Sequence, residues 1–351
     1  MSWTDSPRNP GDPRPAGPPQ PPEASGPCTT RTPVAQLRKG DRISRGIYLV
    51  ETANFKQTRN NKFFIQLSLR DRTGSIKGIL WEATQELFDS FSAEDFLRID
   101  GRVEEFQQNL QIVVDGLEPI ADDSVDFEEF LPVSSRSASD MARELEEVLA
   151  SISDPHLKAL MLAFWDDPEI RKGILRCPAG KVLHHACIGG LLEHILSLVG
   201  AAKLIARNYP RLNADMLVAA SFFHDIGKIR ELSYSRAFNY TDVGQLVGHM
   251  GIGLVMLEEK AKLLPGFPRE VLLHLEHIIA SHHGLPEHGA MKPPMTPEAI
   301  AFHYLDNLDA KLAMVESLAR ELEVQGDAAS EERRWTDFKP ALGRRIFFPG
   351  P

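Results

Sequence analysis

The chain has 351 residues, of which 25% are charged and 42% are hydrophobic, and its formal net charge is −10 at pH 7. These values are ordinary for a globular protein, and the length is sufficient for two domains. They exclude a membrane-spanning chain, because no apolar run approaches the ~20 residues that cross a bilayer, and the Pro-rich N-terminus lacks the apolar stretch of a secretory signal.

Residues 1–32 contain nine prolines, from Pro7 to Pro27, and few large apolar side chains. Such a segment buries too little surface to offset the entropy lost on ordering, so we expect a disordered tail. Residues 33–120 instead show the short runs typical of strands. Strands are expected at 43–50, 63–69, 75–81, 97–106 and 110–114, with a helix at 84–91.

Three strands, a helix and two further strands follow one another in the order of an OB-fold barrel. The segment also resembles nucleic-acid-binding OB domains in its Gly40-Asp41-Arg42 start and in the hairpin sequence of residues 69–77. The sequence therefore predicts a small β-barrel at 33–120, and the resemblance identifies it as an OB fold that binds nucleic acid.

Charge divides the predicted barrel into two halves. Residues 36–80 carry ten Lys or Arg against three Asp or Glu, whereas residues 81–131 carry two Arg against fifteen Asp or Glu. Clustered cations bind phosphates, and aromatic rings stack on unpaired bases. We therefore expect a surface that binds a single strand through Lys56, Arg59, Lys62, Phe64, Lys77 and Trp81. The alternative is that the rings fill the barrel core and the cations lie on a solvated loop.

Residues 121–132 form an acidic linker, after which the pattern becomes helical. Apolar residues recur at three- and four-residue steps over 138–152, 155–165, 189–209, 214–224, 243–264, 268–282 and 296–326. The second domain is therefore expected at 133–330 as an all-α bundle, followed by a C-terminal tail at 331–351. The predicted fold class is multidomain β plus α.

The helical domain holds the residues that suit metal chemistry. All 12 histidines lie at or after His156, and His224-Asp225 ends an apolar run just before Gly227 and Lys228. Divalent metals held by imidazole and carboxylate need ligands from several helices. The candidate ligands occur in the order His194, His224, Asp225, His249, His282, His283, Asp306 and Asp309. Lys228 is either a cation for a phosphate or a solvent-facing lysine at a helix end.

This order resembles the HD-domain metal-dependent phosphohydrolases. The stretches Val182–Ala186, His224–Lys228, Ser281–Gly284 and Leu305–Lys311 are similar to those of the YhaM-type 3′→5′ exoribonucleases, which couple an N-terminal OB domain to a C-terminal HD domain. The resemblance covers roughly residues 33–348.

The resemblance implies roles for the individual residues. His194, His224, Asp225 and Asp306, preferred over Asp309, would hold one divalent metal, and a second would be completed by His249, His282 and His283. Manganese is the favoured metal, with iron, cobalt or magnesium also suited to such ligands. Lys228 joins His224 and Asp225 in the expected catalytic set. His184 and His185 are expected either to contact substrate, which is favoured, or to stabilise the fold. The remaining histidines (His156, His274, His277, His288 and His303) are interpreted as structural or surface residues.

The predicted function is a cytoplasmic metal-dependent exonuclease that removes nucleoside monophosphates from the 3′ end of single-stranded nucleic acid, with RNA favoured over DNA. Cysteine usage agrees with a reducing compartment, since the three cysteines have no paired spacing. One alternative is an HD phosphohydrolase for free nucleotides or cyclic dinucleotides, and another is a non-catalytic single-strand binder. The first leaves the barrel without a role, and the second leaves the complete ligand series without one. The sequence leaves open a homo-oligomeric state, and no membrane partner is expected.

Overall fold

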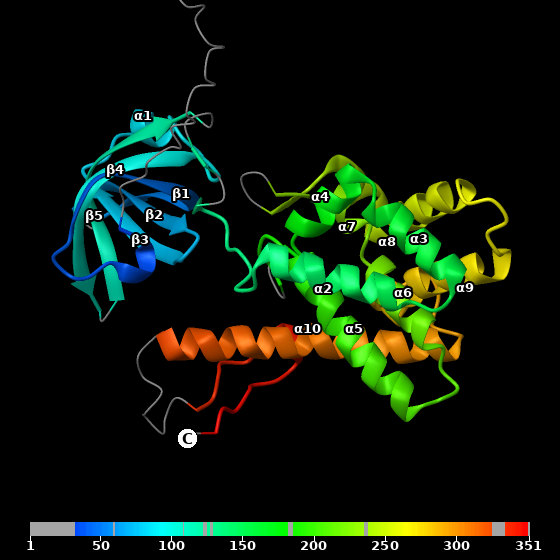
Figure 1. Ribbon diagram of the computed structural model, residues 1–351. Helices are drawn as coiled ribbons and strands as arrows, with labels where there is room; N and C mark the ends of the chain where they lie inside the picture. Colours follow the sequence, from blue (N-terminus) through cyan, green and yellow to red (C-terminus); the bar gives the residue numbers. More distant parts are fainter. Residues whose placement is uncertain are drawn as a thin grey trace, which may run out of the picture.

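A computed structural model describes residues 32–349 except 59, 108, 122–124, 127–128, 182–184, 235–237 and 325–333. Residues 1–31 of the expected tail, Arg59 and His184 therefore lie outside the described residues. The described chain forms a β-barrel followed by a helical domain (Figure 1).

The N-terminal domain is a closed barrel with the strand order β1-β2-β3-β5-β4. β3 and β5 are parallel, and the other neighbouring strands are antiparallel. The elements are η1 (Val34–Gln36), β1 (Arg42–Gln57), β2 (Phe63–Asp71), β3 (Gly74–Trp81), α1 (Gln85–Phe88), β4 (Phe96–Phe106) and β5 (Asn109–Ile120). The order of elements predicted from the sequence is confirmed.

Two strands are longer than expected, because β1 continues to Gln57 and β5 to Ile120. The pairing of β1 shifts register between Val50 and Thr52 on its β2 side, and such irregularities bend a strand. The bend lets one strand pair with β4 at its start and with β2 at its end, which closes the barrel. Along β2, Ile65, Leu67 and Leu69 alternate into the core, which leaves the even-numbered side chains on the outer face.

The second domain packs around α5 and α6, and α6 is buried over most of its length. Its elements are α2 (Ala138–Ser151), α3 (Pro155–Trp165), α4 (Pro168–Arg176), α5 (Gly190–Asn208), α6 (Ala214–Phe223), α7 (Lys228–Glu231), β6 (Leu232–Ser233), β7 (Asn239–Tyr240), α8 (Asp242–Lys262), α9 (Arg269–Ser281), η4 (Pro286–His288) and α10 (Pro297–Val324). The predicted helical domain is confirmed, although α4, α7 and the small β6-β7 sheet were not expected. No helix of the described segments combines the length and apolarity needed to cross a membrane.

Two consecutive linker residues anchor the two domains. Phe130 is 1% exposed and packs its ring against Phe96 of β4, with ring centroids 4.9 Å apart. Leu131 is 2% exposed and packs with Ile188 and Phe238 of the helical domain. The end of the acidic linker is therefore ordered. Its two apolar side chains pack against the barrel and the helical domain, respectively.

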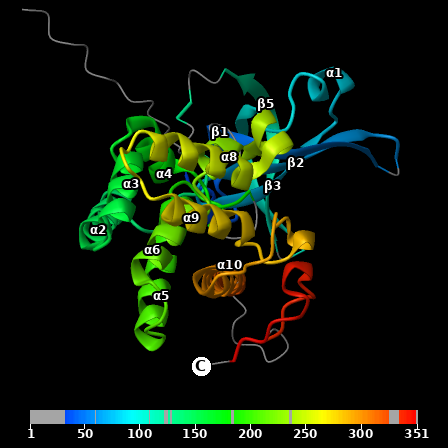
Figure 2. The same ribbon diagram turned by 90° about the vertical axis from the view of Figure 1, so that its right-hand side faces the viewer.

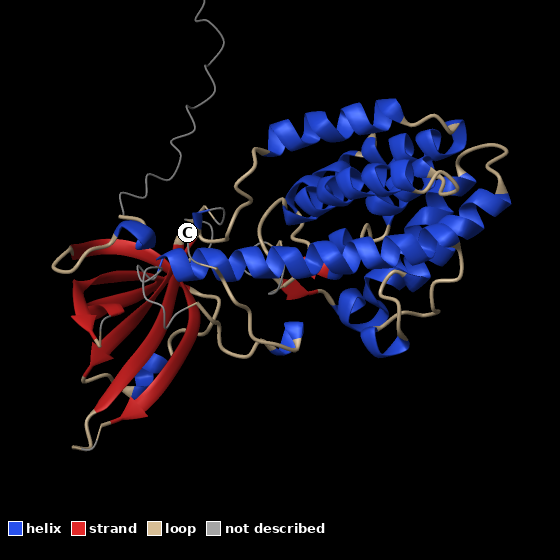
Figure 3. Ribbon diagram, turned by 90° about the horizontal axis from the view of Figure 1, so that it is seen from below, coloured by secondary structure: helices blue, strands red, loops and turns tan. Residues whose placement is uncertain are grey.

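The C-terminal segment is folded where it is described. Residues 334–348 form an antiparallel hairpin in which Trp335 pairs with Phe347 and Lys339 with Arg344, and η6 (Pro340–Leu342) lies at its tip. The hairpin lies beside α10 (Figures 1 and 2). Seen from below, α10 extends from the helical domain toward the barrel (Figure 3).

The domain junction gives a test of stability. Phe130→Ala should lower the free energy of unfolding by about 3–5 kcal/mol, because it removes a large buried ring and leaves a cavity. The exposed neighbour Val133 provides the control, since Val133→Ala should change the free energy by less than about 0.5 kcal/mol. Denaturant unfolding followed by circular dichroism measures both. Equal losses in the two variants would contradict the packing described for Phe130.

Candidate metal centre

The candidate ligands lie at the points where helices of the second domain meet. His194 is on the second turn of α5, His224 and Asp225 directly follow α6, and Asp306 lies in α10. His249 is in α8, and the pair His282-His283 directly follows α9. His194 and His224 are fully buried, and Asp225 and His282 are nearly so. Five elements therefore direct polar side chains into one buried region.

Two glycines make this convergence possible. A Cβ atom at Gly227 would lie 2.0 Å from the carbonyl oxygen of His249, so only glycine allows the turn after His224-Asp225 to approach α8 this closely. At Gly248 the backbone of α8 adopts a φ of 75°, which interrupts the helix just before His249. That positive φ is readily adopted by glycine and strained for other residues. The kink brings His249 toward α9.

The first group of ligand atoms surrounds His194. Its Nε2 atom lies 3.2 Å from Nε2 of His224 and 3.2 Å from Oδ1 of Asp306. Oδ2 of Asp225 lies 3.2 Å from Nε2 of His224. A cation bonded at roughly 2.0–2.2 Å by nitrogen and oxygen atoms spaces those atoms about 3–3.6 Å apart. The first group has the spacing that a bound divalent ion requires.

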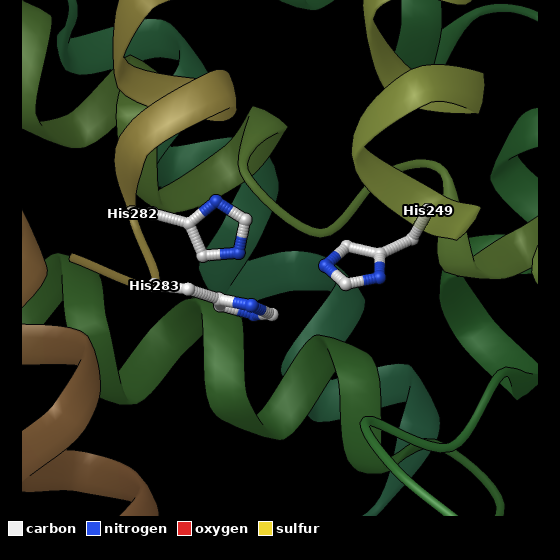
Figure 4. A group of neighbouring side chains, drawn as sticks. All are labelled: His249, His282 and His283. Carbon is white, nitrogen blue, oxygen red and sulfur yellow. The ribbon is translucent and has the colours of Figure 1, made fainter. Parts of the chain in front are cut away.

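The second group consists of His249, His282 and His283, whose ligand atoms all lie within 4.8 Å of one another. The three rings approach one another from α8 and from the end of α9 (Figure 4). Oδ1 of Asp225 lies 3.4 Å from Nε2 of His249 and 3.8 Å from Nε2 of His282. Because Oδ2 of the same residue faces the first group, the Asp225 carboxylate lies between the two groups.

Hydrogen bonds at Nδ1 fix how these imidazoles are oriented. A carbonyl or carboxylate oxygen accepts, so the Nδ1 atom beside it donates, and in a neutral ring Nε2 then carries the lone pair. The five Nδ1 partners are Asp309 Oδ2 for His194, Ser221 O for His224, Glu231 Oε1 for His249, Ile279 O for His282 and His288 O for His283. In their neutral forms, the five rings therefore present five lone pairs to one region together with two carboxylates.

This donor set fits divalent metal ions. Among the buried polar side-chain atoms of the described residues, Oδ1 of Asp225, Nε2 of His249 and Nε2 of His282 have no hydrogen-bond partner. Leaving such atoms unpaired in a buried site is costly, and a cation among them removes that cost. Imidazole and carboxylate ligands suit several divalent transition metals. The unpaired atoms and the types of ligand atom both indicate a divalent metal ion.

Electrostatics favours the ionised form of Asp225 and the protonated form of His194. Burial opposes ionisation of Asp225, but His224 and Lys228 hold the pKa of its carboxyl well below the usual range. Burial also opposes protonation of His194, yet Asp306 and Asp309 outweigh it and raise the pKa of His194 to about 9. Because a coordinating imidazole is neutral, binding a metal at His194 releases a proton, and metal affinity should weaken as pH falls.

The structure contradicts one of the two interpretations of Lys228. Its side chain is 11% exposed, and its Nζ atom donates to Oδ2 of Asp225 and to the carbonyl oxygen of Ala179, each at 2.6 Å. Burial lowers the pKa of Lys228, but Asp225 outweighs it and raises the pKa, so the side chain stays an ammonium ion. The expectation of a solvent-facing lysine is therefore wrong. Its contact with a phosphoryl group stays a prediction, and Lys228 also lines the cavity beside the centre.

Asp306 and Asp309 occupy different sides of the His194 ring. Asp306 faces Nε2, whereas Oδ2 of Asp309 accepts a hydrogen bond from Nδ1 at 2.7 Å. Ser197 donates to the other oxygen of Asp309, so Asp309 orients the imidazole. Nε2 of His185 lies 3.5 Å from Asp309, which brings this expected substrate residue to the edge of the first group.

Sequence reasoning missed several residues of the site. Glu231 accepts hydrogen bonds from both the backbone N and the Nδ1 atom of His249, at 2.8 and 3.1 Å. It is a single glutamate in a short helix, with no motif to mark it. His288 and His303, interpreted as structural or surface residues, line a cavity of about 460 Å³ together with Asp225, Lys228, His282, His283, Asp306, Asn307, Ala310, Lys311, Met314 and Ala341.

Four of the expected strand-binding residues share the outer face of β1, β2 and β3, namely Lys56, Phe64, Lys77 and Trp81. Lys56 pairs across from Phe64, which pairs across from Trp81. The Phe64 and Trp81 rings lie 5.1 Å apart, and Trp81 is 50% exposed, so the alternative that these rings fill the core is wrong. Lys77 precedes Trp81 by four residues in β3, so its side chain lies on the same face. Lys62 is exposed and forms an ion pair with Glu82.

Comparisons with known proteins agree with this architecture. The chain matches the family described as HD domain over residues 191–311 and the OB-fold nucleic acid binding domain over residues 50–120. It is therefore a protein in which a nucleic-acid-binding barrel precedes an HD domain, a class whose site depends on divalent metal.

More specific relatives extend along both domains. The chain is 32% identical over 269 residues to the 3′-5′ exoribonuclease YhaM of Bacillus subtilis (strain 168), covering 76% of this chain and 85% of that protein. It is 33% identical over 284 residues to the protein of the same name from Shouchella clausii (strain KSM-K16), covering 81% and 88%. The chain belongs to the YhaM family of 3′-5′ exoribonucleases. A solved domain of replication protein A from Methanococcus maripaludis matches 27% of this chain and 98% of its own, at 30% identity and a TM-score of 0.22.

The arrangement predicts how metal content depends on Asp225. Asp225→Ala should remove bound divalent metal from both groups, because this carboxylate faces both, while far-ultraviolet circular dichroism stays that of the helical fold. His249→Ala should spare the group around His194. Elemental analysis of the purified variants gives the stoichiometry, and the exposed Glu287 provides a control in Glu287→Ala. Fully active wild-type protein without any divalent metal would contradict the assignment.

Proposed function

We propose that this protein is a metal-dependent 3′→5′ exoribonuclease that binds single-stranded RNA on its barrel and releases nucleoside monophosphates at the centre of its helical domain. The observation that carries this proposal is the convergence of five imidazole lone pairs and two carboxylates beside an open cavity, in a chain whose other domain has a nucleic-acid-binding fold. Membership of the YhaM family supports the polarity and the preference for RNA.

The proposed centre holds two divalent ions, with manganese favoured and iron, cobalt or magnesium as other candidates. His194, His224, Asp225 and Asp306 would hold one, and Asp225, His249, His282 and His283 the other. Divalent ions bound there would neutralise the charge of a phosphodiester and lower the pKa of a water molecule.

The chain's own residues supply the remaining functions. A cavity of about 460 Å³ lies within the roughly 300–1,000 Å³ typical of small-ligand pockets, so it would accommodate one terminal nucleotide. Lys228 offsets the charge of Asp225 and, with Lys311, places positive charge on the cavity wall. Asp309 and Glu231 keep His194 and His249 oriented toward the centre. The cytoplasm is the proposed compartment, and assembly into a homo-oligomer stays a prediction.

The outer face of β1, β2 and β3 is the proposed strand-binding surface. Phe64 and Trp81 would stack on bases, and Lys56 and Lys77 would contact phosphates. Lys62 forms an ion pair with Glu82, which partly neutralises its charge, so it is a weaker candidate for a phosphate contact. Arg59 lies outside the described residues and stays a prediction from the sequence.

Salt dependence tests this surface. Replacing both Lys56 and Lys77 by Ala should weaken RNA binding and reduce the slope of log affinity against log salt by about 1.4, since each phosphate contact on a single strand contributes about 0.7. Fluorescence anisotropy over a salt series measures the slope. The matched control is the double variant Arg143→Ala, Lys262→Ala, which removes two exposed cations elsewhere. An unchanged slope would place the strand on another surface. The same conclusion would follow if the double variant lost as much hydrolysis of a very short RNA as of a long one.

The polarity of degradation tests the activity. A 5′-labelled RNA with a single-stranded 3′ end and an internal hairpin should give a ladder of shortening products that stops near the hairpin, because an OB surface accepts unstacked single strands. Chelator should abolish the ladder, and added Mn²⁺ should restore it. Internal cuts, or a labelled mononucleotide at the earliest time, would argue against 3′→5′ exonuclease activity. Hydrolysis of free nucleotides alone would favour the nucleotide phosphohydrolase alternative.

A further inference from the structure

The C-terminal hairpin, Arg334–Phe348, has the composition of a nucleic-acid-binding element although it belongs to neither matched domain. Its two arms are held by backbone hydrogen bonds from Thr336 to Ile346 at 2.9 Å and from Phe348 to Arg334 at 2.8 Å. Arg345 adds a bond from its Nε atom to the carbonyl oxygen of Thr336 at 2.9 Å. The hairpin is therefore internally braced, and its outward side chains have a defined scaffold.

Those outward side chains are aromatic and cationic. Trp335 is 51% exposed, Phe338 is 61% exposed and Phe347 is 44% exposed. Trp335 and Phe347 lie side by side with ring centroids 5.0 Å apart, and the guanidinium of Arg345 lies over Trp335 at 5.6 Å. The hairpin carries four Lys or Arg against one Asp, in a chain whose net charge is −10. Large exposed rings among cations are unfavourable in water but suit stacked bases and their phosphates.

The position of the hairpin connects it to the metal centre. Ala341, in the η6 turn at its tip, lines the same cavity as Asp225, His282 and Asp306. Lys311 and Met314 of α10 line the same cavity, and the hairpin lies beside α10 (Figure 2). A strand whose last nucleotide occupies the cavity therefore has the hairpin at the rim of that cavity.

We propose that the C-terminal hairpin binds single-stranded RNA next to its 3′ end, with bases stacked on Trp335 and Phe347 and phosphates held by Lys339 and Arg344. This inference rests on the proposed exonuclease function and adds a second strand-binding site to it. The hairpin holds the nucleotides that precede the one in the cavity, while the barrel holds the strand farther from the end. Its cationic charge and its continuity with the cavity favour a polyanionic strand over a second copy of this acidic chain.

Binding and hydrolysis are measured separately to test the hairpin. The double variant Trp335→Ala, Phe347→Ala should weaken binding of a 5′-fluorescein single-stranded RNA about tenfold or more, measured by anisotropy in EDTA, since stacking on each ring strengthens binding about fivefold to a hundredfold. The variant Trp335→Tyr, Phe347→Tyr keeps two stacking rings and should bind within about twofold of wild type. Tyr209→Ala, which removes an exposed ring directly after α5, is the matched control and should have no effect.

The small diester bis(p-nitrophenyl) phosphate reports on the metal centre without a strand. Its hydrolysis in Mn²⁺ should be unchanged by the hairpin variant, while the KM for RNA rises. If Trp335→Ala, Phe347→Ala binds RNA as tightly as wild type and the wild-type protein hydrolyses RNA, the hairpin proposal is overturned and the exonuclease proposal stays intact. Equal losses on RNA and diester, or a change in molecular mass by light scattering, would also overturn it. If the double variant binds RNA more weakly than wild type but the wild-type protein does not degrade RNA, the hairpin proposal is supported and the exonuclease proposal is contradicted.

Discussion

The convergence of lone pairs in the helical domain is the constraint on which the site depends. Five imidazoles are tied at Nδ1 to carbonyl or carboxylate oxygens, so their Nε2 atoms face a buried region that also receives Asp225 and Asp306. Without a cation, three of these atoms have no hydrogen-bond partner among the described residues. The apolar core around α5 and α6 holds this arrangement in place, and a bound cation would give the unpaired atoms a partner.

The surrounding residues serve this constraint by orientation. Asp309, braced by Ser197, and Glu231 turn the rings of His194 and His249. Carboxylate partners of this kind fix the tautomer and raise the basicity of a ligand. Gly227 and Gly248 position the ligands through the backbone. Gly227 allows the turn after Asp225 to approach α8, and Gly248 kinks α8 just before His249. The centre is thus specified by residues well beyond its ligands.

Much of this could be predicted from the sequence, because strand alternation and the ligand motifs are local signals. The barrel order and the series from His194 to Asp306 required only short stretches of chain. The role of Glu231 and the placement of His303 in the cavity depend on contacts between separate segments, which no local pattern reveals. Lys228 shows the same limit, because its burial against Ala179 depends on a loop 49 residues away.

The central claim is that two divalent ions share the Asp225 carboxylate. Anomalous diffraction from crystals of the full chain grown with Mn²⁺ tests it most directly. Two peaks are predicted, one bounded by His194, His224 and Asp306 and the other by His249, His282 and His283, with Asp225 between them. A single peak away from Asp225, or no peak in crystals of active protein, would contradict this account of the centre.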